Sequence, residues 1–243
     1  MTGANGMQLE FIGSGDAFGS GGRSNTCFHV TGTSTNFLFD CGASSLPAMN
    51  ARRFDRNAID TILITHFHAD HFGGLTTREG DLIFTNAEIS VPQPEWDFWM
   101  DEGQMSRAPA PIQERFQAVR ATFEPLAERI RILRGDGEDV VAGLTTVAAP
   151  GHTPGHTAFR LSSGSEQLMV ISDTTNHPAL FAEHPGWHAA FDMDPNMAEQ
   201  SRRRVLGEIA ADRMQMIGSH YPPPATGTLE KNGADGFRFV PRA

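Results

Sequence analysis

The sequence has 243 residues, of which 39% are hydrophobic and 20% charged. This composition is typical of a folded globular protein and excludes a disordered or fibrous chain. Lys and Arg number 19 against 29 Asp and Glu, so the formal net charge is -10. Because binding to a phosphate backbone needs clustered basic residues, this charge disfavours a nucleic-acid-binding function. The length favours a single domain over residues 1–243.

No segment reaches the 18 apolar residues that suggest a membrane span, and the first ten residues lack the basic and apolar regions of a signal peptide. We therefore expect a cytoplasmic protein that does not bind membranes. Met7 is a second candidate for the native start, which would make residues 1–6 a leader. The only cysteines, Cys27 and Cys41, lie in apolar, strand-like runs, where buried free thiols are more frequent than disulfides.

The first part of the chain predicts strands. Short apolar runs at 9–12, 27–30 and 37–39 are bounded by Gly, Ser, Thr or Asn, which predicts an antiparallel meander. The nearly continuous apolar run at 59–65 predicts a strand buried on both faces. The glycine-rich stretch 13–19 has the wrong spacing for a dinucleotide-binding fingerprint and predicts a turn and loop.

The middle of the chain, residues 92–130, has a different pattern. Several prolines frame the aromatic residues Trp96, Phe98 and Trp99, which predicts an irregular excursion. A helix is expected after it at about 112–128, broken near Pro125. Two interpretations of the aromatic cluster stay open: a lid over a substrate pocket, or packing in the core or in a homodimer interface.

A second block of strands is predicted at 140–149, 158–161 and 168–172. Asp194 followed by Pro195 predicts the start of a helix that runs to about Asp212. Successive residues fan around a helix axis, so Arg202, Arg203 and Arg204 are expected on an exposed face. Residues 214–218 predict a last buried strand. Two blocks of strands, each flanked by helices, predict an α/β fold in four layers, an αββα sandwich.

The densest group of potential metal ligands follows the run at 59–65. His66, His68, Asp70 and His71 lie within six residues, and burying three imidazoles and a carboxylate is costly without a cation. In an extended segment His66 and His68 point to the same side, while the next two turn toward a neighbouring point. One segment can therefore supply two adjacent ions.

Three further residues of ligand type, His152, Asp173 and His220, each follow a predicted strand. The carboxyl ends of strands are where α/β sheets bind ligands. Taken singly, each of the three is equally well explained as an ordinary polar residue, but together they indicate a metal centre. His156 is expected to support a ligand, because metal-binding imidazoles need outer partners.

These seven residues resemble the complete metal signature of the metallo-β-lactamase superfamily, whose members are αββα sandwiches. The resemblance implies one metal site formed by His66, His68 and His152. It implies a second formed by Asp70, His71 and His220, with Asp173 bridging the two ions. It also implies that Asp40 supports the centre from a strand end.

Most of the chain resembles a hydrolase branch that includes methyl parathion hydrolases and lactonases, through segments such as 95–99 and 184–187. The opening, residues 11–17 with Arg23 and Asn25, instead resembles ribonuclease Z-like members. The expected function is a dinuclear hydrolase in which hydroxide shared by two divalent ions attacks a small ester, lactone or phosphotriester. Imidazoles and carboxylates without a thiolate suit zinc, with manganese, iron or cobalt as alternatives.

Asp70, His177 and Tyr221 are the candidate catalytic residues, with Tyr221 placed to polarise a carbonyl and His177 to face the substrate or solvent. The expected partner is a small-molecule substrate, and a second copy of the chain is a candidate partner in a homodimer. Alternatives are a ribonuclease Z-like phosphodiesterase, a metal-binding redox protein on the same fold, or a non-catalytic scaffold. Diiron redox members typically carry glutamate where this chain has His68. A serine nucleophile is disfavoured because no Gly-x-Ser-x-Gly motif occurs.

Overall fold

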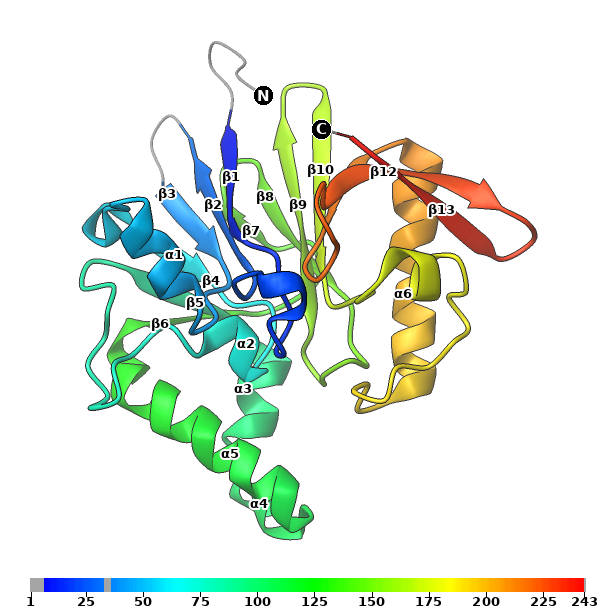
Figure 1. Cartoon of the computed structure of the whole chain (residues 1–243). Coiled ribbons are helices and arrows are strands. Elements are labelled where there is room, and N and C mark those ends of the chain that lie inside the picture. Colours follow the sequence, from blue (N-terminus) through cyan, green and yellow to red (C-terminus); the bar gives the residue numbers. More distant parts are fainter. Residues whose placement is uncertain (1–6, 33–35, 243) are drawn as a thin grey trace. The chain divides into compact units, whose positions relative to one another are not determined.

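The computed structural model describes residues 7–32 and 36–242, so the predicted leader at 1–6 lies outside the described residues. The chain divides into two compact units, one ending at Leu133 and one beginning at Arg134. They are named unit 1 and unit 2 in chain order. In Figure 1 unit 1 runs from blue to green, and unit 2 runs from green to red.

Unit 1 contains a six-stranded sheet in the spatial order β1-β2-β3-β4-β5-β6. The first three strands pair antiparallel, as the predicted meander requires, and β3 to β6 pair parallel. The strands are β1 (Gln8–Gly13), β2 (Cys27–Thr31), β3 (Asn36–Phe39), β4 (Thr61–Leu63), β5 (Glu88–Pro92) and β6 (Ile130–Leu133). The strand expected at 59–65 is thus shorter, and only Thr61–Leu63 pair as β4.

The helices of unit 1 confirm the helix predicted at about 112–128, which is α5 (Ala110–Phe123), and correct the prediction of an irregular excursion before it. Three helices and a 3-10 turn occupy most of residues 92–130, and Figure 1 shows α3, α4 and α5 packed on one another. Proline lies in the first turn of α3, of α5 and of the 3-10 turn (Glu124–Arg129), so the prolines mark the starts of helical elements. The helix α5 ends at Phe123, two residues before Pro125. The helices are α1 (Ser45–Ala51), α2 (Ala69–Phe72), α3 (Gln93–Trp99), α4 (Glu102–Arg107) and α5 (Ala110–Phe123).

The aromatic cluster belongs to the hydrophobic core of unit 1. Trp99 is fully buried there, and Trp96 and Phe98 are partly buried and packed against the same core. The Trp99 ring lies 4.7 Å from that of Phe116 on α5. The core interpretation of these residues is therefore confirmed, and α3 is held between the sheet and α5.

Unit 2 contains a seven-stranded sheet in the order β13-β12-β11-β10-β9-β8-β7, in which only β10 and β11 pair parallel. The segment predicted as one strand at 140–149 is two, because Gly143 turns with a φ of 81°. The strands are β7 (Asp139–Val141), β8 (Leu144–Ala148), β9 (Thr157–Ser163), β10 (Glu166–Ser172), β11 (Gln215–Gly218), β12 (Thr226–Asn232) and β13 (Gly236–Pro241).

Residues 214–218 do not form the last strand, because β12 and β13 follow as a hairpin whose turn includes Gly233. Their polar, exposed residues hid this hairpin from a search for apolar runs. The helix α6 (Pro195–Asp212) starts and ends as predicted, with the Asp194 carboxylate accepting from the Met197 N–H at 3.0 Å. It packs on β12 (Figure 1).

Across residues 7–32 and 36–242, the longest apolar helical stretches fall short of what a membrane-crossing helix requires.

Candidate metal centre

In unit 1 the potential ligands follow β4, which lies between the parallel strands β3 and β5. The loop after β4 carries His66 and His68, and α2 carries Asp70 and His71. His66 Nε2 lies 3.1 Å from His68 Nδ1, and His71 Nε2 lies 3.6 Å from the Asp70 carboxylate. The four residues thus form two neighbouring pairs, as predicted for this segment.

Asp40 supports this loop from the end of β3. Its backbone has a φ of 57°, a left-handed conformation that is rare for a residue with a side chain and often marks functional sites. One carboxylate oxygen accepts from the Thr65 N–H at 2.9 Å, and the other accepts from the Thr65 hydroxyl at 2.9 Å and from His71 Nδ1 at 2.8 Å. Burial raises the pKa of Asp40, and the bonds from His71 and Thr65 oppose this rise without cancelling it.

Glu95, on α3, also supports the loop and was missed by the sequence analysis. Its side chain is fully buried, and Oε1 accepts from the Phe67 N–H at 2.8 Å and from the Trp99 indole N–H at 2.9 Å. Phe67 stands between His66 and His68, so this carboxylate fixes the backbone between two potential ligands. In the sequence Glu95 is an acidic residue beside aromatic residues, and this pattern is also common on protein surfaces.

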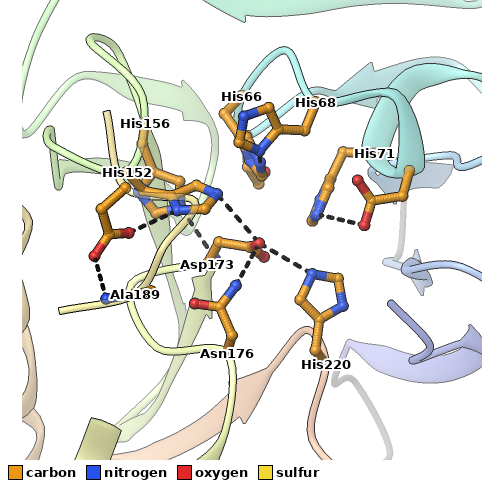
Figure 2. Close-up of polar contacts among 12 residues, drawn as sticks. His66, His68, His71, His152, His156, Asp173, Asn176, Ala189 and His220 are labelled. Atoms are coloured by element: carbon orange, nitrogen blue, oxygen red, sulfur yellow. Dashed lines mark hydrogen bonds and ion pairs between the residues drawn. The ribbon is translucent and has the colours of Figure 1, made fainter. Parts of the chain in front are cut away.

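In unit 2 the three predicted residues lie together around one carboxylate oxygen. Asp173 Oδ2 is 3.0 Å from His220 Nε2 and 3.4 Å from His152 Nε2, and it accepts a 2.9 Å hydrogen bond from the Asn176 amide (Figure 2). Asp173 follows β10, His220 follows β11, and His152 lies in the loop after β8. A single oxygen between two imidazoles is the arrangement that a bridging carboxylate would need.

His156 holds Asp173 in place. Its Nδ1 lies 3.0 Å from the Ala149 carbonyl oxygen, and its Nε2 accepts from the Asp173 N–H at 3.0 Å. Ser172, directly before Asp173, has a left-handed φ of 47°, which repeats at the end of β10 the conformation seen at Asp40 after β3. The structure therefore gives His156 the supporting position predicted for it.

Asp192 supports His152, and it too was missed by the sequence analysis. Its Oδ1 accepts from His152 Nδ1 at 2.9 Å, and its Oδ2 accepts from Arg202 at 3.1 Å. Burial favours a raised pKa for Asp192, but the hydrogen bond and charge of His152 and the charge of Arg202 outweigh it and hold the pKa below its ordinary value. The expectation of an exposed Arg202 is wrong, because its helical position faces the interior of unit 2 and its side chain is fully buried.

The two remaining candidates are placed differently. His177 is exposed, directly before the π-helical turn η4 (Pro178–Ala182). Tyr221 is fully buried, its hydroxyl contacts that of Thr175, and its ring lies 5.1 Å from that of Phe239. Burial raises the pKa of Tyr221 above its ordinary value. A catalytic role of His177 or Tyr221 stays a prediction.

Cys27 and Cys41 are both buried free thiols, as expected from their apolar surroundings. The donors in each unit are imidazoles and carboxylates, and the two thiols lie in the core of unit 1. This donor chemistry fits zinc and other divalent first-row metals.

Comparison with known proteins identifies the family. The model of the metallo-β-lactamase superfamily matches residues 20–214. The "Anti-Pycsar protein Apyc1" of Bacillus phage vB_BsuM-Goe3 is 38% identical over 178 residues, which cover 69% of this chain and 67% of that protein. A protein of the same name from Bacillus phage 010DV004 is 39% identical over 69 residues, and the match spans only about a quarter of its length. Ribonuclease Z of Methanosarcina acetivorans is 28% identical over 69 residues, or 28% of this chain and 23% of that protein.

Two solved structures are similar over most of the chain. The "hydrolase AbOPH in beta lactamase superfamily" has a TM-score of 0.82 at 24% identity, covering 89% of this chain and 79% of its own. AidC, "a Dizinc Quorum-Quenching Lactonase" in complex with a product, has a TM-score of 0.82 at 22% identity, covering 98% and 92%. The chain belongs to the metallo-β-lactamase superfamily and has the fold of its hydrolases.

Proposed function

We propose that the protein is a hydrolase whose two ligand sets together bind two divalent metal ions, zinc in the first place. Membership of the superfamily and the grouping of potential ligands within each unit support this proposal. In the proposed centre Asp173 binds both ions. The first ion is bound by His66, His68 and His152, and the second by Asp70, His71 and His220.

The observation that carries the proposal is the orientation of two buried imidazoles. His71 and His152 each direct Nδ1 at a buried carboxylate, that of Asp40 and that of Asp192. A carboxylate at Nδ1 holds the ring proton there, so Nε2 carries the lone pair. This pairing of carboxylate and imidazole is typical of metal-binding histidines, and both units contain it.

Two bound divalent ions would supply Lewis acidity for a substrate oxygen and a water of lowered pKa. The protein's own residues set the conditions for this chemistry. Asp40 and Asp192 fix two imidazole protons, while Asn176 and His156 orient the side chain and backbone of Asp173. No serine or cysteine nucleophile is required.

For the substrate we propose a small ester, lactone or phosphotriester. The fold shared with the lactonase AidC and with the hydrolase AbOPH supports this class. A second candidate is the activity of the sequence relatives, which are more similar in sequence. The phage protein named for anti-Pycsar activity is 38% identical. A ribonuclease Z also matches, in line with the ribonuclease Z-like opening, and this match favours a phosphodiester substrate.

The experiment that tests the proposal combines metal analysis with a substrate panel. Purified protein is loaded with zinc, its metal content is measured, and hydrolysis of phenyl acetate, a γ-lactone, a phosphotriester and a phosphodiester is followed, with Asp173→Ala as the inactive control. We expect about two metals per chain and metal-dependent turnover of the ester or lactone. Turnover of the phosphodiester alone would establish the second candidate. Absence of bound metal would refute both.

A further inference from the structure

Arg202 is an unusual residue in unit 2 because its charged side chain has no exposed surface. Burial of a guanidinium costs several kcal/mol unless hydrogen bonds and an opposite charge compensate. Four such contacts surround it. They are Nη2 to Asp192 Oδ2 at 3.1 Å, Nε to the Thr174 carbonyl at 2.9 Å, and Nη1 to the carbonyls of Pro185 at 2.9 Å and Trp187 at 2.7 Å.

These contacts lead to two of the proposed metal ligands. Asp192 accepts from Arg202 with one oxygen and from His152 Nδ1 with the other. Thr174 directly follows Asp173, so the bond to its carbonyl holds the backbone on one side of Asp173, while His156 holds the Asp173 N–H on the other. One guanidinium therefore joins α6 to the supports of both residues.

We propose that Arg202 is a positioning residue of the metal centre, which orients His152 through Asp192 and Asp173 through the Thr174 carbonyl. The inference rests on the proposed function, since it concerns the same ligands. Arginine is suited to this position because its planar fork presents donors in several fixed directions. Lysine keeps the charge but has a single ammonium group, which cannot span the carboxylate and three separate carbonyls.

A merely structural role would be to hold the loop of residues 174–192 on α6 for stability alone. The two roles differ in what they predict for metal binding. If Arg202 orients His152, its replacement weakens metal affinity beyond any loss of stability, and it does so through Asp192. If it only stabilises the loop, metal affinity of the folded protein stays unchanged.

The test compares Arg202→Lys with Arg203→Lys, a matched control on the next residue, whose side chain is 38% exposed and pairs with Glu199 on the surface. Zinc affinity is measured by competition with a chelator, and the absorption spectrum of the cobalt-loaded protein is recorded. We expect Arg202→Lys to lower zinc affinity about 10- to 100-fold and to alter the cobalt bands, as loss of an outer partner does in other metal sites. Arg203→Lys should change neither. Equal zinc affinity of Arg202→Lys and wild type would overturn the proposal.

Asp192→Asn covers the case in which Arg202→Lys does not fold, because it keeps the guanidinium and its three carbonyl contacts. An amide presents an acceptor to His152 or to Arg202 but not to both, so zinc affinity should fall by a similar factor. In the double variant the combined loss should be smaller than the sum of the two, since both variants disturb His152 through one carboxylate and only Arg202→Lys also disturbs the Thr174 carbonyl contact. Unchanged affinity in Asp192→Asn, or additive losses, would refute the route through Asp192.

The outcomes also distinguish the inference from the proposed function. If the variants lose zinc affinity while no substrate is turned over, the inference stands and the proposed reaction fails. If the wild-type protein binds no metal, both fail.

Discussion

Units 1 and 2 each carry a set of potential metal ligands, but the two sets are built differently. In unit 1 the four ligands lie within six consecutive residues, and two buried carboxylates, Asp40 and Glu95, fix the loop that carries them. In unit 2 the potential ligands follow three different strands, and their supports include a distant loop and α6 besides His156 and Asn176. A local set depends on the conformation of one loop, whereas a dispersed set depends on long-range contacts that hold separate segments together.

The largest effect is expected at Asp173, the residue proposed to bind both ions. Asp173→Ala removes the oxygen that lies between His152 and His220, so the protein should lose both metals and roughly 10³-fold or more in turnover, because each ion contributes several kcal/mol to the transition state. His68→Ala, in unit 1, should lose one metal and keep the other. Elemental analysis and kcat for a simple ester measure the difference. If Asp173→Ala still bound two metals per chain, Asp173 would not be a bridging ligand, and the expected difference from His68→Ala would be absent.

A smaller effect is expected from the support of a single imidazole. Asp40→Asn leaves an acceptor on only one side of the side chain, so either the Thr65 N–H or His71 Nδ1 loses its partner. If the imidazole proton moves to Nε2, that nitrogen can no longer bind a metal. We expect a 10- to 100-fold loss of metal affinity, measured by chelator competition. Because Asp40 supports a ligand of unit 1 and Asp192 one of unit 2, the losses in Asp40→Asn and Asp192→Asn should add in the double variant. Losses that do not add would show that Asp40 and Asp192 are not independent supports.

The same difference explains what the sequence could predict. His66 to His71 form a dense motif, and His152, Asp173 and His220 follow predicted strands, so these candidates could be named from the sequence. Asp40 could be named only through the resemblance to the superfamily. Asp192 and Arg202 were missed because their meaning depends on contacts between segments far apart in sequence: Arg202 lies 50 residues after His152 in a run of three arginines. Arg202 is the fully buried arginine of that run, and the periodicity of the sequence did not predict which of the three would be buried.

The fold shows a parallel contrast. The meander of unit 1 and the boundaries of α6 were predicted from apolar runs and an Asp-Pro cap, which are local signals. The hairpin of β12 and β13 was missed because exposed polar residues dominate its outer end. The helices α3 and α4 were missed because the prolines around them were interpreted as breaks in structure, although proline is well suited to the first turn of a helix.

The stability of each unit can be followed separately, because unit 1 contains both cysteines and unit 2 contains Tyr221. Glu95→Ala leaves the buried Phe67 N–H and the Trp99 indole without this acceptor, which should lower the free energy of unfolding of unit 1 by about 2–4 kcal/mol. Glu95→Gln keeps an acceptor oxygen and should retain most of that stability. The readout is the reaction of Cys27 and Cys41 with a thiol reagent, since both cysteines lie in unit 1.

The thiols suit this measurement because burial, together with the neighbouring Cys41, raises the pKa of Cys27 well above its ordinary value, so the folded protein should react slowly even at pH 8. Glu95→Ala should accelerate the reaction. Tyr221, the only tyrosine, reports on unit 2 by its ultraviolet absorbance and should be unaffected at the denaturant concentrations that expose the thiols. Simultaneous exposure of Tyr221 would show that the two units unfold as one.

The smallest effect is expected on the surface of unit 2, beside the buried Arg202. Hydrogen bonds from Arg203 and then His188 lower the pKa of Glu199. A carboxyl with a lowered pKa adds stability that is present above its unfolded pKa, near 4.5, and is lost as the pH falls through the folded value. Because solvent screens this pair, Glu199→Gln should reduce the free energy of unfolding at pH 7 by only about 0.3 kcal/mol. The difference from wild type, followed by urea unfolding and far-ultraviolet circular dichroism, should vanish below the folded pKa, and a constant difference down to pH 3 would assign the effect to packing and not to charge.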